Sequence, residues 1–407
     1  MTNPQEIAMD RAARADIPIA FVLYGAPDQV SLDQDPRVVP AMRNLFDLAL
    51  KEMKKSRFEG IDLHMSNDAS IMEGSTNAVT ARVGLTVHLM FKFDVKTVPQ
   101  EINGYRVMGD VLPDHTLKLL YHDANQGLLC IPYLATAMSL HDIIKDGLLS
   151  ETEVVALYEE IARHMLGLWT DTYRAVRPNY EDHFDRRLRS RTKKAQRLFH
   201  STVAGQAVSF SQLLRLPLVV NGVEYPPLAQ LCQDAWTMIL ENAAPFSVTA
   251  HRDEHAKNIL VDMATAERVP PWYLVDLPNV QRAADWVWSI AKMRHWWLVY
   301  YYLDQAKRTG SSPTRLQEID MRFEATHDRV LIQYDLADQI PSICRKLDEQ
   351  VESLAEQVGV VLQDHAWRSR YPASLFLVFY GSVPHHERSQ HLIPVLLGEA
   401  AKAMSLK

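Results

Sequence analysis

Apolar and polar residues alternate between residues 79 and 93. Every odd position in this stretch is apolar, the even positions are mostly polar, and Gly84 lies in the middle. A period of two places the apolar side chains on one face of a strand, and a glycine permits a bend or a tight turn. The pattern predicts two strands, or one long strand bent at Gly84.

Turn-forming residues precede these strands, and a helix signal follows them. The stretch "MEGSTNAV" contains four small residues that let backbone N–H groups come close to a ligand. They are Gly74, Ser75, Thr76 and Asn77. Lys92 lies near the end of the second strand on its polar face, and "VPQEINGYRVM" predicts a helix that starts after Pro99 with Glu101 in its first turn. The order along the chain is glycine loop, strand, lysine, and helix with glutamate.

Strand signals become rare in the later part of the chain. Residues 127–144 predict a buried strand that leads through a connector into a helix. The next segment begins with Ser150 followed by Glu153, the pattern of a helix capping box. We therefore expect an α+β protein with two lobes, a small β-rich N-lobe at residues 1–133 and a larger, mainly helical C-lobe at residues 134–407.

Two patterns in the later part predict local structure. The stretch "LPLVVNGVEYPPL" predicts a short hairpin around Asn221 and Gly222. In "DWVWSIAKMRHWWLVYYYLD", large apolar residues recur at spacings of three and four, as on the core-facing side of a helix. They are Trp286, Ile290, Met293, Trp297 and Tyr300.

Basic residues are concentrated between residues 185 and 197. They are Arg186, Arg187, Arg189, Arg191, Lys193, Lys194 and Arg197. Such a run is usually the solvated face of a helix. The alternative is a surface that binds an anionic acceptor or a substrate that contains a nucleotide.

Composition narrows the class of protein. The 407 residues are 47% hydrophobic and carry a formal net charge of -7, so the surface as a whole does not attract nucleic acid or an anionic membrane. Cys130, Cys232 and Cys344 lie far apart, which argues against a disulfide framework and against a cysteine-based zinc site. We expect a cytoplasmic protein with no membrane helix and no nucleic-acid partner, and the oligomeric state stays open.

The stretch "HRDEHAKNILVD" carries the strongest candidate chemistry. Asp253 and Asn258 lie five residues apart in a predicted loop before a strand, and the next strand, "WYLVDLP", ends near Asp276. Phosphoryl transfer from ATP needs a carboxylate that orients or deprotonates a hydroxyl group, together with oxygen ligands for Mg²⁺. These three residues supply both kinds of group.

Together these segments resemble the aminoglycoside phosphotransferase and choline kinase branch of the protein-kinase-like fold. In that branch the loop reads H-G-D-x-H-x-x-N; here Arg252 replaces the glycine, whereas His255 keeps the residue typical of small-molecule kinases. The resemblance also covers "EGSTNAV", the lysine of "FKF" and a helix similar to "E-Y-R-V-L", all in the same order, and spans roughly residues 70–290. It implies a two-lobed fold and an ATP-dependent kinase.

The resemblance also implies a role for each matched residue. Asp253 would be the catalytic base, and Asn258 and Asp276 would bind Mg²⁺. Lys92 would contact the α- and β-phosphates of ATP and pair with Glu101.

Two further segments would bind the nucleotide. The loop at residues 74–77 would cover the phosphates, and "CIPYL" would be the hinge, with the carbonyl of Pro132 and the N–H of Leu134 contacting adenine. The sequence departs from the family pattern at Pro278, where a second acid often lies, and at Gly104, which belongs to an extra helical turn between Glu101 and "YRVM".

The acceptor is expected to be a small molecule with a hydroxyl group, such as an antibiotic, a sugar, an amino alcohol or a nucleoside. Protein kinases have a long activation segment that ends in "APE", and here a strong helix signal follows soon after Asp276. The alternatives are a pseudokinase-like binding module, a protein kinase, and a metal-dependent hydrolase that uses His251, Asp253 and His255.

Overall fold

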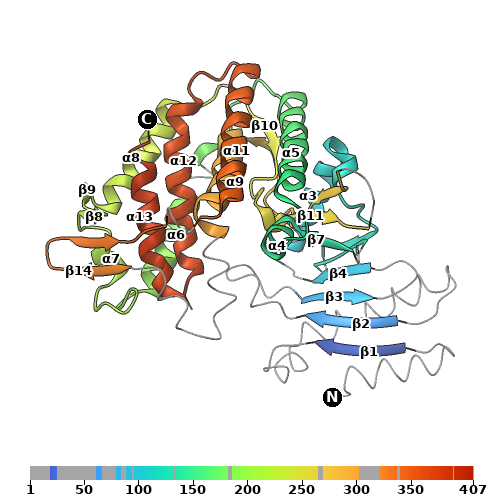
Figure 1. Ribbon diagram of the computed structural model, residues 1–407, viewed down its shortest axis with the longest axis horizontal. Helices are drawn as coiled ribbons and strands as arrows, with labels where there is room; N and C mark the ends of the chain where they lie inside the picture. The colour runs from blue at the N-terminus through green and yellow to red at the C-terminus, as the bar shows by residue number, and fades with distance from the viewer. Residues whose placement is uncertain are drawn as a thin grey trace. The chain divides into compact units, whose positions relative to one another are not determined.

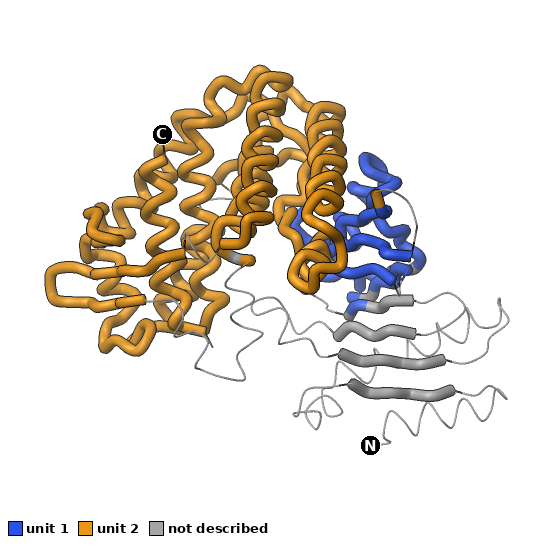
Figure 2. Tube along the Cα trace, viewed as in Figure 1, with its two compact units in different colours: residues 1–138, 260–266, 270–280 blue, residues 139–259, 267–269, 281–407 orange. Residues whose placement is uncertain are grey.

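The computed structural model (Figure 1) describes the following parts of the chain: residues 19–24, 61–66, 79–83, 89–93, 96–125, 127–132, 134, 136–181, 186–264, 269–301, 321–336, 340–387 and 389–406. The chain divides into two compact units (Figure 2). Unit 1 consists of residues 1–138, 260–266 and 270–280, and unit 2 of residues 139–259, 267–269 and 281–407. The lobe boundary expected between residues 133 and 134 stays a prediction.

A six-stranded sheet is the largest element of unit 1. Its strands, in spatial order, are β1 (Ile19–Tyr24), β2 (Ile61–Ser66), β3 (Val79–Val83), β4 (Leu89–Phe93), β6 (Leu128–Pro132) and β5 (Tyr121–Asp123). All neighbours are antiparallel except β1 and β2. The alternating stretch forms β3 and β4, so the prediction of two strands is confirmed, and Lys92 lies opposite Thr80 in their register.

Helix α3 (Val98–Val111) follows β4 in unit 1. Proline favours the first turn of a helix, and Pro99 lies in that turn, which explains why the helix begins here. A short helix, η2 (Pro113–His115), leads to Thr116, which forms a parallel bridge with Leu274.

A smaller three-stranded sheet carries Asp276 in unit 1. Its order is β12 (Trp272–Leu274), β11 (Ile259–Asp262) and β7 (Ala137–Ser139). The His115 ring stacks on the Trp272 ring with a centroid distance of 3.9 Å, and His115 Nδ1 lies 3.0 Å from the Trp272 carbonyl oxygen. These contacts fix the strand that ends two residues before Asp276.

Unit 2 is mainly helical (Figure 1). Its longer helices are α5 (Glu151–Asp171), α6 (Arg186–Leu198), α8 (Leu228–Glu241), α9 (Trp286–His295), α11 (Ser342–Val361), α12 (Trp367–Ser382) and α13 (Ile393–Ala403). Its shorter ones are α4 (Leu140–Asp146), α7 (Phe210–Leu213), η4 (Ala256–Asn258), the π-helix η5 (Trp296–Tyr300), η7 (Val383–His385) and η8 (Gln390–Leu392). Helix α12 packs against α8, α9 and α13, and α11 packs against α5 and α9. None of the described helices is long and apolar enough to cross a membrane.

Two small sheets complete the described part of unit 2. One has the order β14 (Arg322–Ala325), β15 (Val330–Gln333), β8 (Leu218–Val220) and β9 (Val223–Tyr225); the other pairs β10 (Val248–Ala250) with β13 (Gln281–Ala284). Asn221 and Gly222 connect β8 to β9 with φ of 51° and 82°, as a tight hairpin turn requires. The predicted hairpin is therefore confirmed, and the described residues together form an α+β structure.

A buried ion network holds the N-terminal end of α9 in the core of unit 2. Asp285 caps the helix by accepting a hydrogen bond from the Val287 N–H at 3.1 Å. Arg370 is completely buried and lies 2.9 Å from Asp285 and 2.6 Å from Asp364. The Tyr180 hydroxyl also donates a hydrogen bond to Asp285, at 2.8 Å. Helix α9, whose side chains contact the loop between β10 and β11, is thus fixed at its beginning.

Candidate functional site

In unit 1, Lys92 lies between two carboxylates. Its ammonium nitrogen is 2.6 Å from Oε2 of Glu101 in α3 and 2.9 Å from Oδ1 of Asp276, which follows β12. Glu101 is buried, whereas the side chains of Lys92 and Asp276 keep 16% and 19% of their surface exposed. The expected ion pair of Lys92 with Glu101 is present, and the lysine and one acid remain accessible to a ligand.

The charges around Lys92 keep it protonated. Burial alone would lower the pKa of Lys92, but the carboxylates of Asp276 and Glu101 outweigh this effect and raise the pKa above its ordinary value. Burial, together with the same two carboxylates, raises the pKa of the adjacent Tyr105, so that its hydroxyl stays neutral. Lys92 is therefore the cationic group of this site.

Asp276 has an unusual backbone conformation, with φ of 58°. Few residues other than glycine adopt this left-handed region, although aspartate and asparagine tolerate it better than most. The next residue, Leu277, lies against Gly104 of α3 so closely that a Cβ on Gly104 would stand 2.8 Å from the Leu277 Cβ and overlap its carbonyl oxygen. The glycine that departs from the family pattern is thus the contact between α3 and the segment that carries Asp276.

In unit 2, the loop between β10 and β11 is held by hydrogen bonds within itself. The Asp253 N–H donates to Nδ1 of the fully buried His251 at 3.1 Å, and the His255 N–H donates to the Asp253 carbonyl at 2.8 Å. The Asn258 side-chain amide donates to the same carbonyl at 2.9 Å. Because this bond uses the amide nitrogen, it fixes the orientation of the Asn258 side chain and leaves its Oδ1 as the acceptor atom.

Helix α9 braces the same loop. Arg252 has φ of 68°, a left-handed conformation at the position where the resembled family has glycine. Its carbonyl accepts a hydrogen bond from the Trp288 indole at 3.1 Å, and Glu254 accepts one from the Ser289 hydroxyl at 2.7 Å. Asp285 caps this helix and belongs to its ion network, and Trp288 braces the loop.

Lys292 is a site residue that sequence reasoning missed. Its ammonium nitrogen lies 2.6 Å from Oδ1 of Asp253, and both side chains are mostly buried. Residues 286–293 of α9 are buried on every side of the helix. A lysine in such a helix must pair with an acid, because an unpaired buried charge is costly. The presence of a lysine in this buried helix was therefore the sequence signal that could have revealed Lys292 as a site residue.

The His251, Asp253 and His255 side chains do not form a metal cage. Among the residues that the structure describes, no group of three or more His, Cys, Asp or Glu side chains could hold a metal ion. The His255 ring stacks on Trp296 with a centroid distance of 4.5 Å. In unit 1 the partly exposed Asp276 carboxylate is an oxygen donor of the kind that Mg²⁺ prefers, and in unit 2 the Asn258 amide oxygen is another.

Other expected nucleotide contacts stay predictions. Residues 74–77 lie outside the described part of the chain. Pro132 ends β6 opposite Leu89, and the Leu134 carbonyl accepts a hydrogen bond from the Ala137 N–H at 3.1 Å. The backbone groups expected to contact adenine are the Pro132 carbonyl and the Leu134 N–H, and both adjoin the end of β6.

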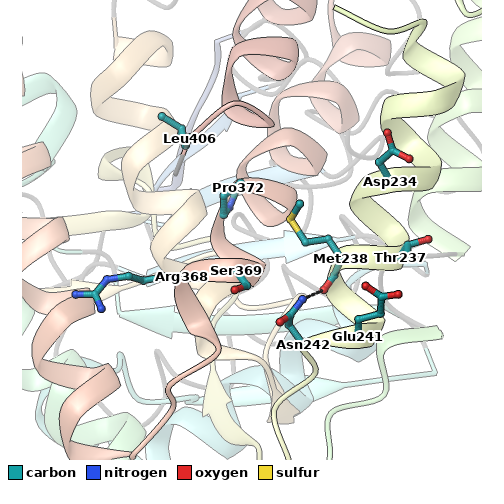
Figure 3. A pocket seen from close by; sticks show the side chains of 9 residues that line it. All are labelled: Asp234, Thr237, Met238, Glu241, Asn242, Arg368, Ser369, Pro372 and Leu406. Carbon is teal, nitrogen blue, oxygen red and sulfur yellow. Dashed lines mark hydrogen bonds between the residues drawn. The ribbon is translucent and has the colours of Figure 1, made fainter.

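A hollow of about 560 Å³ lies between α8 and α12 in unit 2 (Figure 3). Its lining residues are Asp234, Thr237, Met238, Glu241, Asn242, Arg368, Ser369, Pro372 and Leu406. The Asn242 side chain donates a hydrogen bond to the Met238 carbonyl across one wall, at 2.9 Å. None of the residues predicted from the sequence lines this hollow.

No protein-family model matches the sequence, and no curated protein does. Among the solved structures to which the chain is similar are three that are small-molecule kinases or are described as such. Choline kinase from Streptococcus pneumoniae is 14% identical, with a TM-score of 0.39, over 83% of this chain and 99% of its own. Ethanolamine kinase from Plasmodium vivax is 8% identical, with a TM-score of 0.45, over 81% and 78%. A putative aminoglycoside phosphotransferase from Ralstonia eutropha is 10% identical, with a TM-score of 0.46, over 88% and 98%.

Proposed function

We propose that this protein is an ATP-dependent phosphotransferase with a protein-kinase-like fold, which transfers the γ-phosphoryl group of ATP to a hydroxyl group of a small acceptor. The observation that carries the proposal is the position of Lys92 between Glu101 and Asp276 in unit 1. Lys92 is shared between a buried glutamate and a partly exposed aspartate, so one acid holds the ammonium group while the other stays accessible to a ligand.

Each of these three residues has a role in holding ATP. Lys92, which its neighbours keep charged, would donate to the non-transferred phosphates. Glu101 keeps the ammonium group in place from α3. Asp276 is accessible enough to bind a metal ion while it still contacts the lysine. Mg²⁺, when bound, would neutralise charge on the phosphate oxygens, and the family resemblance assigns Asp276 and Asn258 as its ligands.

Asp253 would act on the acceptor. Its carboxylate would accept the proton of the hydroxyl group or orient that group for in-line attack. The backbone of Asp253 is fixed by His251, His255 and Asn258, and Lys292 fixes one carboxylate oxygen at 2.6 Å. Catalysis of this kind is mainly positioning and electrostatic stabilisation, so a rigid loop favours it.

The nucleotide half of the proposal is tested by thermal shift without any acceptor, because a ligand that binds only the native state raises Tm. Wild-type protein should be stabilised by ATP and more strongly by ATP with Mg²⁺. Asp276→Asn, which tolerates the left-handed backbone but lacks the charge, should lose most of the Mg²⁺ effect. Asp114→Asn, at an exposed position of unit 1, is the matched control and should behave as wild type. A wild-type chain that ATP does not stabilise would contradict the proposal.

The catalytic half is tested with Asp253→Asn. This variant should bind ATP with Mg²⁺ nearly as tightly as wild type, because Asp253 contacts the acceptor and not the nucleotide in the proposed reaction. Its turnover, measured as ADP release with an acceptor found by screening hydroxyl compounds, should fall by several orders of magnitude. Turnover at the wild-type rate would remove Asp253 from the mechanism.

A further inference from the structure

Helix α6 turns part of its basic surface toward η7 in unit 2. The Arg191 guanidinium contacts Nε2 of His385, and the Thr192 and Tyr380 hydroxyls form a hydrogen bond at 2.7 Å. Arg191 and Lys194 are partly buried, whereas the intervening Lys193 is exposed. The basic run is therefore more than a solvated face, because two of its cations lie on the side of the helix that packs against the protein.

The same region is connected to the proposed base through α9 and α12. The rings of His295 in α9 and Phe379 in α12 are 6.1 Å apart, and α12 continues directly into η7, where His385 lies. Lys292 precedes His295 by about one helical turn, and its ammonium group contacts Asp253 at 2.6 Å. Arg191 of α6 thus meets His385 of η7, and α9, which packs against the preceding helix α12, brings Lys292 to the carboxylate that would receive the acceptor hydroxyl.

Two histidines in this region have lowered pKa values. Burial lowers the pKa of His385, and the charges of Arg191, Lys194 and Lys292 lower it further. Burial and neighbouring cations, first of all Lys292, likewise lower the pKa of His295.

Two carboxylates partly offset the effect of the cations on these pKa values. Asp253 raises the pKa of His295, and the exposed Glu387 raises that of Lys194. The pKa of Lys194 is nevertheless lowered, by its own burial and by the neighbouring Arg191. Like charges held together inside a protein create a positive potential that favours an anion.

We propose that the acceptor of this enzyme carries an anionic group, a phosphate or a carboxylate, and that this group binds to the cationic cluster formed by Arg191, Lys194 and Lys292 around His385. The inference rests on the proposed function, because it assumes that the hydroxyl group of the acceptor is delivered to Asp253. Lys292 contacts that base, so an acceptor whose hydroxyl group reaches Asp253 brings its neighbouring substituents to the cluster. A hydroxy acid, a sugar phosphate or a nucleoside phosphate fits this chemistry, whereas an amine would add a further positive charge.

The first test measures binding of inorganic phosphate to the full chain by isothermal titration calorimetry at constant ionic strength. Wild type should bind phosphate, and the double variant Arg191→Gln/Lys194→Gln should bind it at least tenfold more weakly. Lys193→Gln is the matched control, since it removes one charge from the exposed side of the same helix and should leave the affinity unchanged. Two results overturn the proposal: equal affinities in wild type and the double variant, or no binding of phosphate by wild type.

The second test identifies the acceptor class. Related hydroxyl compounds are offered in neutral, amine, and phosphate or carboxylate forms, and ADP release is measured. We expect turnover of the anionic forms, with a KM that rises at least tenfold in Arg191→Gln/Lys194→Gln and stays unchanged in Lys193→Gln. Turnover of a neutral or amine form at equal rates in all three proteins overturns the proposal. A failure of the proposed function can be distinguished from a failure of this inference. If the proposed function is wrong, ATP does not stabilise the protein, whereas the phosphate titration tests the cationic cluster without any nucleotide.

Discussion

Gly104 of α3 lies directly against Leu277, the residue that follows Asp276. Helix α3 also carries Glu101, which holds Lys92 from the other side. Helix α3 thus positions both Lys92 and the segment that carries Asp276, the proposed metal ligand. The close approach requires a residue without a Cβ, and this explains the glycine in the turn between Glu101 and "YRVM".

Replacing Gly104 with alanine should therefore damage the site. Alanine favours a helix by up to about 1 kcal/mol relative to glycine, but here its Cβ would overlap Leu277 and force the segment away, at a cost of about 1–3 kcal/mol. We expect lower stability in urea unfolding and at least tenfold weaker binding of ATP with Mg²⁺. Gly109→Ala in the same helix is the control, because nothing lies within 4 Å of the added Cβ. Equal stability of the two variants would contradict this account.

Local patterns predicted the parts of the fold that depend on sequence neighbours. The alternation before and after Gly84 predicted β3 and β4, the Asn221-Gly222 pair predicted a hairpin, and Ser150 with Glu153 predicted a capping box that the structure contains. In each case the residues that interact are close in sequence, so a short pattern contains the information. The ion pair of Lys92 with Glu101 was expected only from the family resemblance.

Contacts between distant segments could not be predicted in this way. Lys292 meets Asp253, and Trp288 meets Arg252, because α9 packs beside the loop, which no pattern in either segment specifies. The segment "ASLFLVFY" lies in α12, which is buried on nearly all sides, so no polar face in the sequence reveals its helical period. The interior Pro372 further obscured the helix.

The left-handed backbone of Arg252 makes a second prediction. Glycine adopts φ of 68° without a penalty, whereas an L-residue with a Cβ is strained there by about 1 kcal/mol. Arg252→Gly and Arg252→Ala both remove the side chain, so they differ only in backbone preference, and the glycine variant should be more stable by about 1 kcal/mol. Urea unfolding measures the difference. At Lys193, in the exposed face of α6, the alanine variant should instead be more stable than the glycine variant. If the alanine variant were the more stable one at Arg252 as well, this would be evidence against strain at Arg252.

The buried network around Arg370 makes a third prediction. Arg370→Met would leave the carboxylates of Asp285 and Asp364 buried without their cation, which costs about 3–5 kcal/mol in comparable buried pairs. The exposed Arg368, two residues earlier, contacts Glu356, and Arg368→Met should cost at most about 1 kcal/mol. Chemical unfolding of the two variants compares a buried and an exposed arginine in one helix. A small effect at Arg370 would mean that water reaches the two acids.

The buried His295 predicts how stability changes with pH. It faces Lys292 on its own helix and His255 and Asp253 from the loop, and burial with the nearby cations holds its pKa well below the ordinary value. The folded protein therefore keeps His295 neutral, whereas the unfolded chain takes up a proton below about pH 6.5. Because the unfolded state then binds more protons, this histidine lowers the free energy of unfolding by about 2 kcal/mol between pH 7 and pH 5.

A non-titrating residue at this position should remove that part of the pH dependence. In His295→Asn, the free energy of unfolding should fall less steeply between pH 7 and pH 5 than in wild type, by about the same 2 kcal/mol. His200 is exposed, so His200→Asn is the matched control and should leave the slope unchanged. Equal slopes in wild type and His295→Asn would show that His295 takes up its proton in the folded protein. The positive potential inferred around Lys292 would then be too weak to keep this histidine neutral, and an anionic acceptor would gain little from it.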